Sequence, residues 1–419
     1  MIMDINNHPC FNPEVRHKTG RIHLPVAAKC NVQCNFCNRK FDCANESRPG
    51  VSTAVLKPEQ AEIYLGEILE KVPNIAVVGI AGPGDPFANA KETMETLERI
   101  HARYPDKLLC LSSNGLYISK YIPRLAELNV SHVTITVNAV NPKIGAEIYE
   151  WVYYNNKSYH GIEGAQILLD RQTEAIKLLK QHGITVKINT VVIPRVNEFH
   201  VHEISEYVAK LGADVQNCIP LIPVEGTAFG DVNTPSPTHM RAVRAKASVH
   251  IKQMSHCARC RADAVGLLGE NNSSETEQLL IAAKNLNTFK LKPYIAVSTS
   301  DGNWVNQHLG IAPFLSVYRW SNGQAELVEQ RAIPIDSEDR WLALAEAFSD
   351  CQSILTAGVG RTPLKTLQRQ GINIISMDGL ISDALEALFK GNNISESVLK
   401  LNGKCGYGST CSGSGLGCK

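Results

Sequence analysis

The sequence predicts an α/β protein in which an open, partial (β/α)6 barrel precedes a second, smaller α/β unit. Short runs rich in Val, Ile and Leu alternate with amphipathic stretches between residues 21 and 222, and this alternation repeats six times. Continuous apolar runs are typical of parallel strands buried on both faces, and the strand–helix alternation is typical of a parallel sheet. Six units are too few for a complete (β/α)8 barrel, so we expect an open one.

The expected strands are separated by clear helical patterns. The best marked helix begins at Pro58, and apolar residues from Ala61 to Val72 share one of its faces. Strands are expected at 21–26, 75–80, 107–112, 131–137, 184–192 and 214–221. Further helices are expected at about 89–103, 119–128, 163–182 and 197–211. Because ligands bind at the carboxyl ends of the strands in such sheets, we expect the loops after the strands to form the site.

The chain divides into four expected parts. Residues 1–268 form the barrel domain, 269–292 have the composition of a linker, 293–391 form a second α/β domain, and 392–419 are a Gly/Ser/Cys-rich tail. In the second domain, strands are expected near 294–299, 314–320, 325–330, 353–357 and 372–376. Its helices are expected near 338–349, 361–370 and 381–390.

The composition is that of an ordinary globular protein with a net charge of +1. No basic stripe interleaved with aromatic residues occurs, so we expect no nucleic-acid partner. No apolar stretch approaches the roughly 18–20 residues of a membrane span, and the first 13 residues hold no apolar signal segment, so a cytoplasmic location without membrane contact is expected. In that reducing compartment, thirteen cysteines indicate metal or redox chemistry, with Cys351 the expected core cysteine.

Three cysteines, Cys30, Cys34 and Cys37, follow the first expected strand in the pattern C-x3-C-x2-C. Three thiolates can hold three irons of a [4Fe–4S] cluster, which leaves the fourth iron open to a small molecule. Radical S-adenosylmethionine (SAM) enzymes need this open iron, because SAM binds it through its amino and carboxylate groups. The alternative is a closed zinc site, for which Cys43 could supply the fourth ligand.

Glycines and polar residues follow other expected strands and are candidates for binding SAM. Gly82, Gly84 and Asp85 lie in a GPGDP segment after the second strand, where glycine lets the backbone approach a ligand closely. A plain turn would explain the same residues. Three asparagines are candidates at the same edge of the sheet, although Asn is also a common turn residue: Asn114, Asn138 and Asn189.

Six more soft ligands are expected around the same strand-end rim. They are Cys10, His23, Cys43, Cys110, Cys257 and Cys260. Cys110 and His23 could instead be core residues, and the C-x2-C pair could be half of a zinc site. Zinc would then need two ligands from distant segments, whereas the whole set suits two additional [4Fe–4S] clusters.

Residues 8–266 resemble the NifB family of radical SAM proteins of nitrogenase cofactor biosynthesis. The resemblance is carried by HPCFN at 8–12, RIHLPVA at 21–27, the cysteine segment 30–50, GPGDPFAN at 82–89, SSNG at 112–115 and CARCRADA at 257–264. It implies that Cys30, Cys34 and Cys37 bind the SAM cluster and that the six other ligands hold two [4Fe–4S] substrate clusters. It also implies fusion of those clusters and insertion of a carbide derived from the SAM methyl group, which yields the eight-iron precursor NifB-co. His23 and Glu46 are the candidates for moving protons, and a solvated loop carboxylate is the alternative for Glu46.

The second domain resembles the small NifX/NafY-type cofactor-binding domain, which has a ribonuclease H-like α/β fold. The segments IAVSTSDG at 295–302, VNQHLG at 305–310 and TAGVG at 356–360 carry this resemblance, and Leu309 departs from the Phe that is common there. It implies that His308 binds or orients an iron–sulfur product, with a surface turn histidine as the alternative. Cys405, Cys411 and Cys418 in the tail match no pattern.

The sequence thus favours a radical SAM enzyme of lyase or transferase type. A non-catalytic iron–sulfur carrier or scaffold is one alternative, but a passive carrier does not need an open iron. A radical SAM peptide-modifying enzyme with auxiliary clusters is another, but it leaves the second domain unexplained. The expected partners are iron–sulfur cluster donors, an electron donor such as ferredoxin or flavodoxin, and cofactor carrier or scaffold proteins of nitrogenase assembly.

Overall fold

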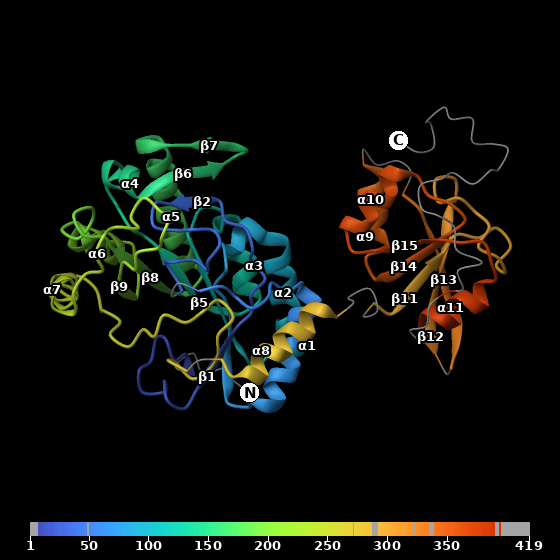
Figure 1. The fold of residues 1–419 in the computed structure, drawn as a ribbon, viewed down its shortest axis with the longest axis horizontal. Coiled ribbons are helices and arrows are strands. Elements are labelled where there is room, and N and C mark those ends of the chain that lie inside the picture. Colours follow the sequence, from blue (N-terminus) through green and yellow to red (C-terminus); the bar gives the residue numbers. More distant parts are fainter. Residues whose placement is uncertain are drawn as a thin grey trace. The chain divides into compact units, whose positions relative to one another are not determined.

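The computed structural model divides the chain into two compact units, Met1–Leu286 and Asn287–Lys419 (Figure 1). It describes residues 7–47, 50–270, 272–286, 292–321, 323–334, 339–389 and 394. Each unit has its own sheet and its own hydrophobic core.

The first unit is built on a curved seven-stranded sheet with the order β10-β1-β3-β4-β5-β8-β9. Six strands are parallel and confirm the predicted half-barrel: β1 (Gly20–His23), β3 (Ile75–Ile80), β4 (Leu108–Ser113), β5 (Val130–Thr136), β8 (Thr185–Val192) and β9 (Val215–Pro220). The seventh, β10 (Val265–Gly266), pairs antiparallel with β1.

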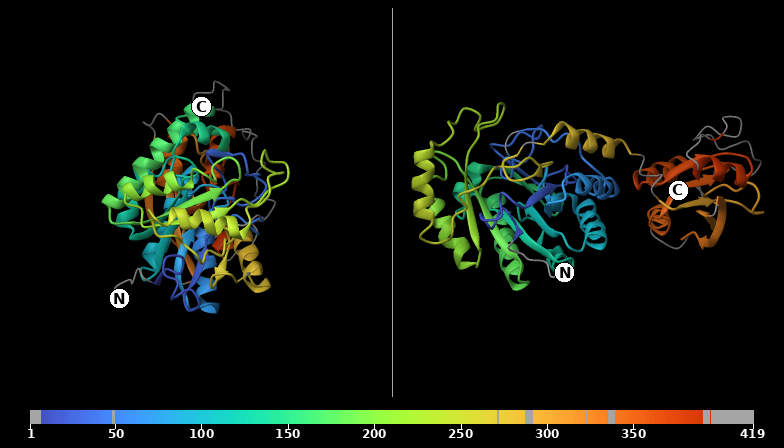
Figure 2. Two further views of the ribbon diagram at one scale, coloured as in Figure 1. Left: turned by 90° about the vertical axis from the view of Figure 1, so that its left-hand side faces the viewer. Right: turned by 90° about the horizontal axis from the view of Figure 1, so that it is seen from below.

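Helices cover the outer face of this sheet (Figures 1 and 2). They are α1 (Pro58–Lys71), α2 (Ala90–Arg103), α3 (Ile122–Glu127), α5 (Gly161–Gln181), α6 (Val201–Lys210) and α7 (Pro237–Ala247), with short 3-10 turns η2 (Pro86–Asn89) and η3 (Ser119–Tyr121). The outward side chains of the strands and the apolar stripes of the helices form one core. In α1, for example, Tyr64, Leu65 and Ile68 are fully buried, as the spacing in the sequence predicts.

A small three-stranded sheet holds part of the cysteine loop. It consists of β2 (Val32–Cys34), β6 (Tyr149–Tyr154) and β7 (Lys157–Tyr159), and α4 (Pro142–Ile148) precedes β6. Cys34 therefore lies on a strand and pairs with Tyr149. The sequence patterns did not predict β2, β6, β7 or α4.

The prediction of a linker over 269–292 is wrong for most of that range. Residues Ser274–Asn285 form helix α8, which begins at the capping residue Ser273 and packs on α1. Leu280 and Ala283 are buried in the core of the first unit. The boundary between the units follows Leu286.

The second unit has a mixed five-stranded sheet with the order β13-β12-β11-β14-β15. Its strands are β11 (Tyr294–Val297), β12 (Phe314–Ser321), β13 (Gln324–Ala332), β14 (Cys351–Thr356) and β15 (Asn373–Ser376), and its helices are α9 (Arg340–Ala347), α10 (Arg361–Arg369) and α11 (Ile381–Phe389). The first three strands are antiparallel, and β11, β14 and β15 are parallel. All eight elements lie close to their predicted ranges, and Cys351 is fully buried in the core as expected.

Among the helices in the described part of the chain, none combines the length and apolar character that crossing a bilayer requires.

Candidate functional site

The cysteine loop after β1 lines a cavity that we call the cysteine pocket. Its cysteines are Cys30, Cys34, Cys37 and Cys43. Burial raises the pKa of the Cys30 thiol to about 11, with a further rise from the nearby Asp85 carboxylate. Burial and neighbouring cysteines also raise the pKa values of Cys34 and Cys43. Buried thiols that repel one another as anions suit a ligand that brings positive charge, as the irons of a cluster do.

Amide groups are placed to donate hydrogen bonds to these sulfurs. Asn45 Nδ2 lies 3.7 Å from Cys34 Sγ and 3.6 Å from Cys43 Sγ, and Asn114 Nδ2 lies 3.8 Å from Cys30 Sγ. Hydrogen bonds to cluster-bound sulfurs tune iron–sulfur sites. Asn138, which is fully buried, donates to Asn45 Oδ1 at 3.0 Å, so it orients Asn45 and lines neither this cavity nor the next.

The GPGDP segment holds the cysteine loop against the sheet. Gly84 N donates to Ala27 O, and a Cβ at Gly84 would lie only 2.1 Å from Lys29 O, so no larger residue fits between the two loops. The buried Asp85 carboxylate accepts from Ser113 Oγ at 3.0 Å and from Asn114 N at 2.7 Å. Gly84, Asp85 and Asn114 line the cysteine pocket, whereas Gly82 does not.

The other predicted ligands gather in a second cavity, which we call the chamber. The titratable and sulfur-bearing residues that line the chamber are His8, Cys10, Arg21, His23, Glu46, Cys110, His132, Lys187, Met254, Cys257, Arg259 and Cys260. Of the six soft ligands expected outside the C-x3-C-x2-C motif, only Cys43 lies in the cysteine pocket instead.

The chamber extends into the barrel, beyond the strand-end rim where the predicted soft ligands were expected. Cys110 is the third residue of β4, His132 the third of β5 and Lys187 the third of β8, so all three lie toward the amino ends of their strands. Side chains alternate along a strand, so every second residue points into the barrel and can form its lining. The sequence predicts Cys110 within its strand, and from there it lines the chamber.

His23 and Cys110 approach each other across β3. A Cβ at Gly79 would lie 2.8 Å from Cys110 Sγ and 3.1 Å from His23 Cδ2, so glycine leaves the space that both side chains occupy. His23 Nδ1 lies 2.9 Å from Arg261 O, which can only accept a hydrogen bond. Nδ1 therefore carries the proton, and Nε2 of the neutral ring keeps a lone pair for a metal.

Glu46 lies at the boundary between the two cavities and lines both. Its carboxylate accepts hydrogen bonds from Thr136 Oγ1 at 3.1 Å and from Asn189 Nδ2 at 2.8 Å. Burial raises the pKa of this carboxyl, although Lys187 and the hydrogen bonds lower it in part. Asn189 thus orients Glu46 and also lines the chamber.

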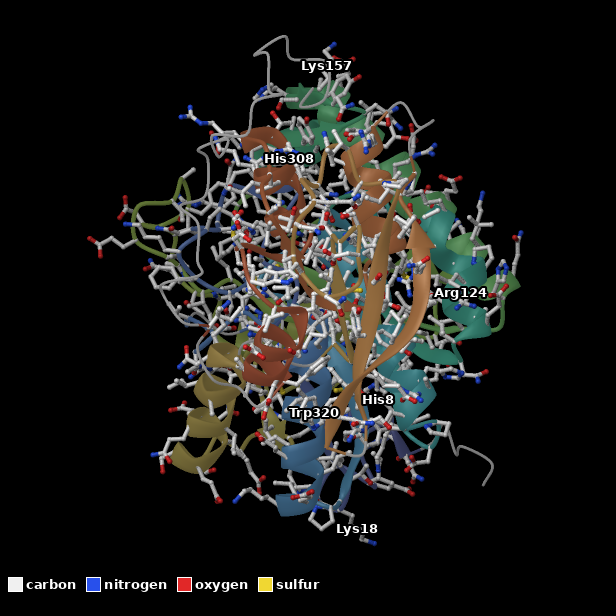
Figure 3. All side chains as sticks on the ribbon, turned by 90° about the vertical axis from the view of Figure 1, so that its right-hand side faces the viewer. His8, Lys18, Arg124, Lys157, His308 and Trp320 are labelled. Atoms are coloured by element: carbon white, nitrogen blue, oxygen red, sulfur yellow. The ribbon has the colours of Figure 1, made fainter. Side chains whose placement is uncertain are left out.

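The segment before β1 brings Cys10 to the chamber. Its neighbour His8, labelled in Figure 3, is buried and packs against His132 with ring centroids 4.4 Å apart. Phe11 packs against the same His132 ring at 4.2 Å. His8 Nε2 is buried without a hydrogen-bond partner. Burial raises the pKa of the Cys10 thiol to about 12.

The C-x2-C pair reaches the chamber from the segment before β10. Cys260 Sγ lies 3.1 Å from Nη2 of the buried Arg21, and Cys257 is exposed. Nowhere among the described residues do three or more His, Cys, Asp or Glu side chains converge closely enough to hold a single metal ion.

Sequence reasoning missed five titratable residues of the chamber, namely His8, Arg21, His132, Lys187 and Arg259. A signal for Arg21, His132 and Lys187 was present, because each interrupts an apolar strand at a position whose neighbours in sequence point outward. Burial lowers the pKa of Lys187, but nearby Cys10 and Glu46 more than offset this, and its pKa lies above the usual value.

In the second unit, a hydrogen bond from the backbone N–H of Gly310 and close contact with Gly358 position the His308 ring. Its Nδ1 accepts from Gly310 N at 3.0 Å, and a Cβ at Gly358 would lie 2.8 Å from the ring. Nε2 is buried without a partner (Figure 3 labels the residue). The tail cysteines Cys405, Cys411 and Cys418 lie outside the described residues.

Two family matches cover most of the chain. Residues 24–208 match the Radical SAM superfamily, and residues 292–391 match the family described as Dinitrogenase iron-molybdenum cofactor. Among solved structures, Streptococcus suis SuiB bound to S-adenosylmethionine is 14% identical with a TM-score of 0.41, over 57% of this chain and 51% of that one.

Curated relatives match the chain over nearly its whole length. The FeMo cofactor biosynthesis protein NifB of Chlorobaculum tepidum is 46% identical, and the match covers 100% of both chains. The NifB of Klebsiella pneumoniae is 38% identical over 87% of this chain and 86% of the relative. The chain therefore belongs to the NifB family of radical SAM proteins of FeMo-cofactor biosynthesis.

Proposed function

We propose that this protein fuses two [4Fe–4S] substrate clusters and inserts a carbide derived from the SAM methyl group, forming the eight-iron precursor NifB-co. The observation that carries the proposal is the pair of adjoining cavities, which share Glu46 and Ser112 in their linings. One cavity has the C-x3-C-x2-C cysteines, and the other has five of the six remaining soft ligands.

In this proposal the cysteine pocket holds the catalytic cluster. Cys30, Cys34 and Cys37 bind three irons, and SAM takes the fourth. The bound cluster and SAM supply the one-electron chemistry of the radical SAM family. Gly84 and Asn114 border SAM, while Asp85 keeps the loop after β3 in place through Ser113 and Asn114.

The chamber receives the iron–sulfur substrates. The proposed ligands are Cys10, His23, Cys110, Cys257 and Cys260 in the chamber, with Cys43 from the adjoining cysteine pocket. His23 is suited to a substrate because imidazole binds iron more labilely than thiolate does. Glu46, at the boundary, is placed to move a proton between the cavities, and its raised pKa favours this role.

The second unit is proposed to hold the product. His308 Nε2 is buried and unpartnered, and it belongs to the part of the chain that matches the cofactor family. Iron–sulfur donors, a ferredoxin or flavodoxin and a cofactor carrier would then supply, reduce and unload the enzyme.

Anaerobic reconstitution with iron and sulfide tests this proposal through iron counts and EPR with and without SAM. The wild-type chain is expected to hold about twelve irons, four for each of three clusters. Cys34→Ala should abolish SAM cleavage and the SAM-dependent EPR change while the substrate clusters remain. Cys218→Ala is the matched control, because Cys218 is fully buried outside both cavities. SAM cleavage at the wild-type rate in Cys34→Ala would exclude the assignment.

A further inference from the structure

The chamber has more buried positive charge than negative. The charged residues among its lining are Arg21, Lys187, Arg259 and Glu46. Arg21 is 2% exposed and Lys187 is 8% exposed. Three cations thus face a single carboxylate.

None of the three cations forms an ion pair with a carboxylate among the described residues. Arg21 donates to Gly266 O at 2.5 Å and to Cys260 Sγ at 3.1 Å, so its position is fixed by the backbone of β10. Arg259 donates to two backbone carbonyls, Pro220 O and Ala44 O, both at 3.0 Å. Both arginines therefore have structural partners.

Lys187 differs from the two arginines. Within the part of the chain that the structure describes, its Nζ has no hydrogen bond and no ion pair, and its recorded contact is with the Phe11 ring at 5.8 Å. The groups whose charges most raise the pKa of Lys187 are Cys10, Glu46, Cys257 and Cys110. Glu46 already accepts from Thr136 and Asn189.

The Lys187 ammonium has lost part of its hydration and has no direct partner in return, and only the through-space charges of groups such as Cys10 and Glu46 favour it. A bound anion would complete its environment. A [4Fe–4S] cluster with more than two thiolate ligands is anionic overall, and five cysteines shared between two substrate clusters give at least one of them more than two. Three of the groups that raise the pKa of Lys187 are cysteines proposed to bind these clusters.

We propose that Lys187 is an electrostatic anchor that retains anionic iron–sulfur substrate inside the chamber. This inference rests on the proposed function of the chamber. Lys187 is two residues from Asn189 on β8, and both side chains line the chamber. Strand β8 therefore presents a cation to the substrates and, farther along the barrel, the amide that orients Glu46.

Lys187→Met tests the anchor, because it keeps the length of the side chain and removes its charge. The reconstituted variant should lose iron to a chelator several-fold faster, and only from the substrate clusters. Their midpoint potential should shift to more negative values, because nearby positive charge favours the reduced cluster. The SAM-dependent EPR signal should be unchanged.

Lys187→Arg should restore iron retention and potential, since it restores the charge. Lys180→Met is the matched control: Lys180 lies just before β8, pairs with Asp214 at 2.6 Å and does not line the chamber. Lys180→Met should lower the unfolding temperature and leave iron retention unchanged. A merely structural Lys187 would behave like Lys180, with lower stability and normal retention.

The outcomes separate the two proposals. If the wild-type chain holds a single cluster, the proposed function of the chamber fails. If the wild type holds three clusters and Lys187→Met retains them with unchanged potential, only the anchor is excluded. The same variants can be compared as full-length proteins throughout, by iron and sulfide per folded chain.

Discussion

At the residue scale, a single hydrogen bond decides which nitrogen of His23 is free. The Arg261 carbonyl accepts a hydrogen bond from the Nδ1–H group, so Nε2 keeps its lone pair and lies near Cys110. Burial and the nearby Arg21 lower the pKa of His23 to about 4, and the ring is neutral at physiological pH. A neutral, oriented imidazole is the form that binds metals.

His23→Ala is expected to lower the iron content of the reconstituted protein by up to one cluster and to suppress precursor formation. The SAM cluster should persist because its three cysteines are untouched. Iron per folded chain and the unfolding temperature should be measured together. His200→Ala is the control, since His200 is buried, accepts from Val140 N and lies outside both cavities. It should cost about 1–3 kcal/mol of stability with normal iron. A wild-type iron content per folded chain in His23→Ala would show that His23 is a core residue and no cluster ligand.

The sequence could predict the cysteines and His23, because their residue types are rare and their spacing is chemically specific. It could not place Arg21 beside Cys260, since 239 positions separate them and no local pattern links them. Lys187 and His132 are similar cases. Their position inside the barrel depends on which face of each strand points inward, and this requires the register of the whole sheet.

At the element scale, most helices and the strands of the two large sheets, apart from the two-residue β10, could be predicted because each has a clear apolar pattern. Helix α8 could not, because its apolar stripe is narrow and polar residues precede it. Its position depends on contacts with α1: Gln60 Nε2 donates to Lys284 O at 2.7 Å and to Leu286 O, and Lys71 pairs with Glu275. Those partners are distant in sequence, so tertiary packing decides this helix.

A fragment that ends at residue 268 should therefore be less stable than one that ends at 286. Its loss of α8 exposes the face of α1 that Leu280 and Ala283 cover, at a cost of at least about 3 kcal/mol. Urea unfolding of the two metal-free fragments, followed by circular dichroism, measures the difference. Equal midpoints would show that α8 adds nothing to the first unit.

At the scale of the whole molecule, each unit has its own core, and every residue proposed for SAM cleavage belongs to the first. The 1–286 fragment should therefore bind its clusters and cleave SAM at a rate within about twofold of the full chain. Anaerobic reconstitution and counting of 5′-deoxyadenosine give the comparison. His308→Ala in the full chain is the companion variant and should also cleave SAM normally. A soluble 1–286 fragment that holds its clusters but leaves SAM intact would contradict this division.

The pairing of β1 with β10 has a consequence for synthesis of the chain. Arg21 pairs with Gly266, so the first strand acquires its second neighbour only after about 245 more residues have been made. At 5–20 residues per second, this takes about 12–50 s. During that interval Cys257 and Cys260 do not yet exist, and the barrel lacks one edge. The lining of the chamber is thus complete only when residues 257–266 have been made, and the iron–sulfur substrates proposed for it can be fully enclosed only after that point.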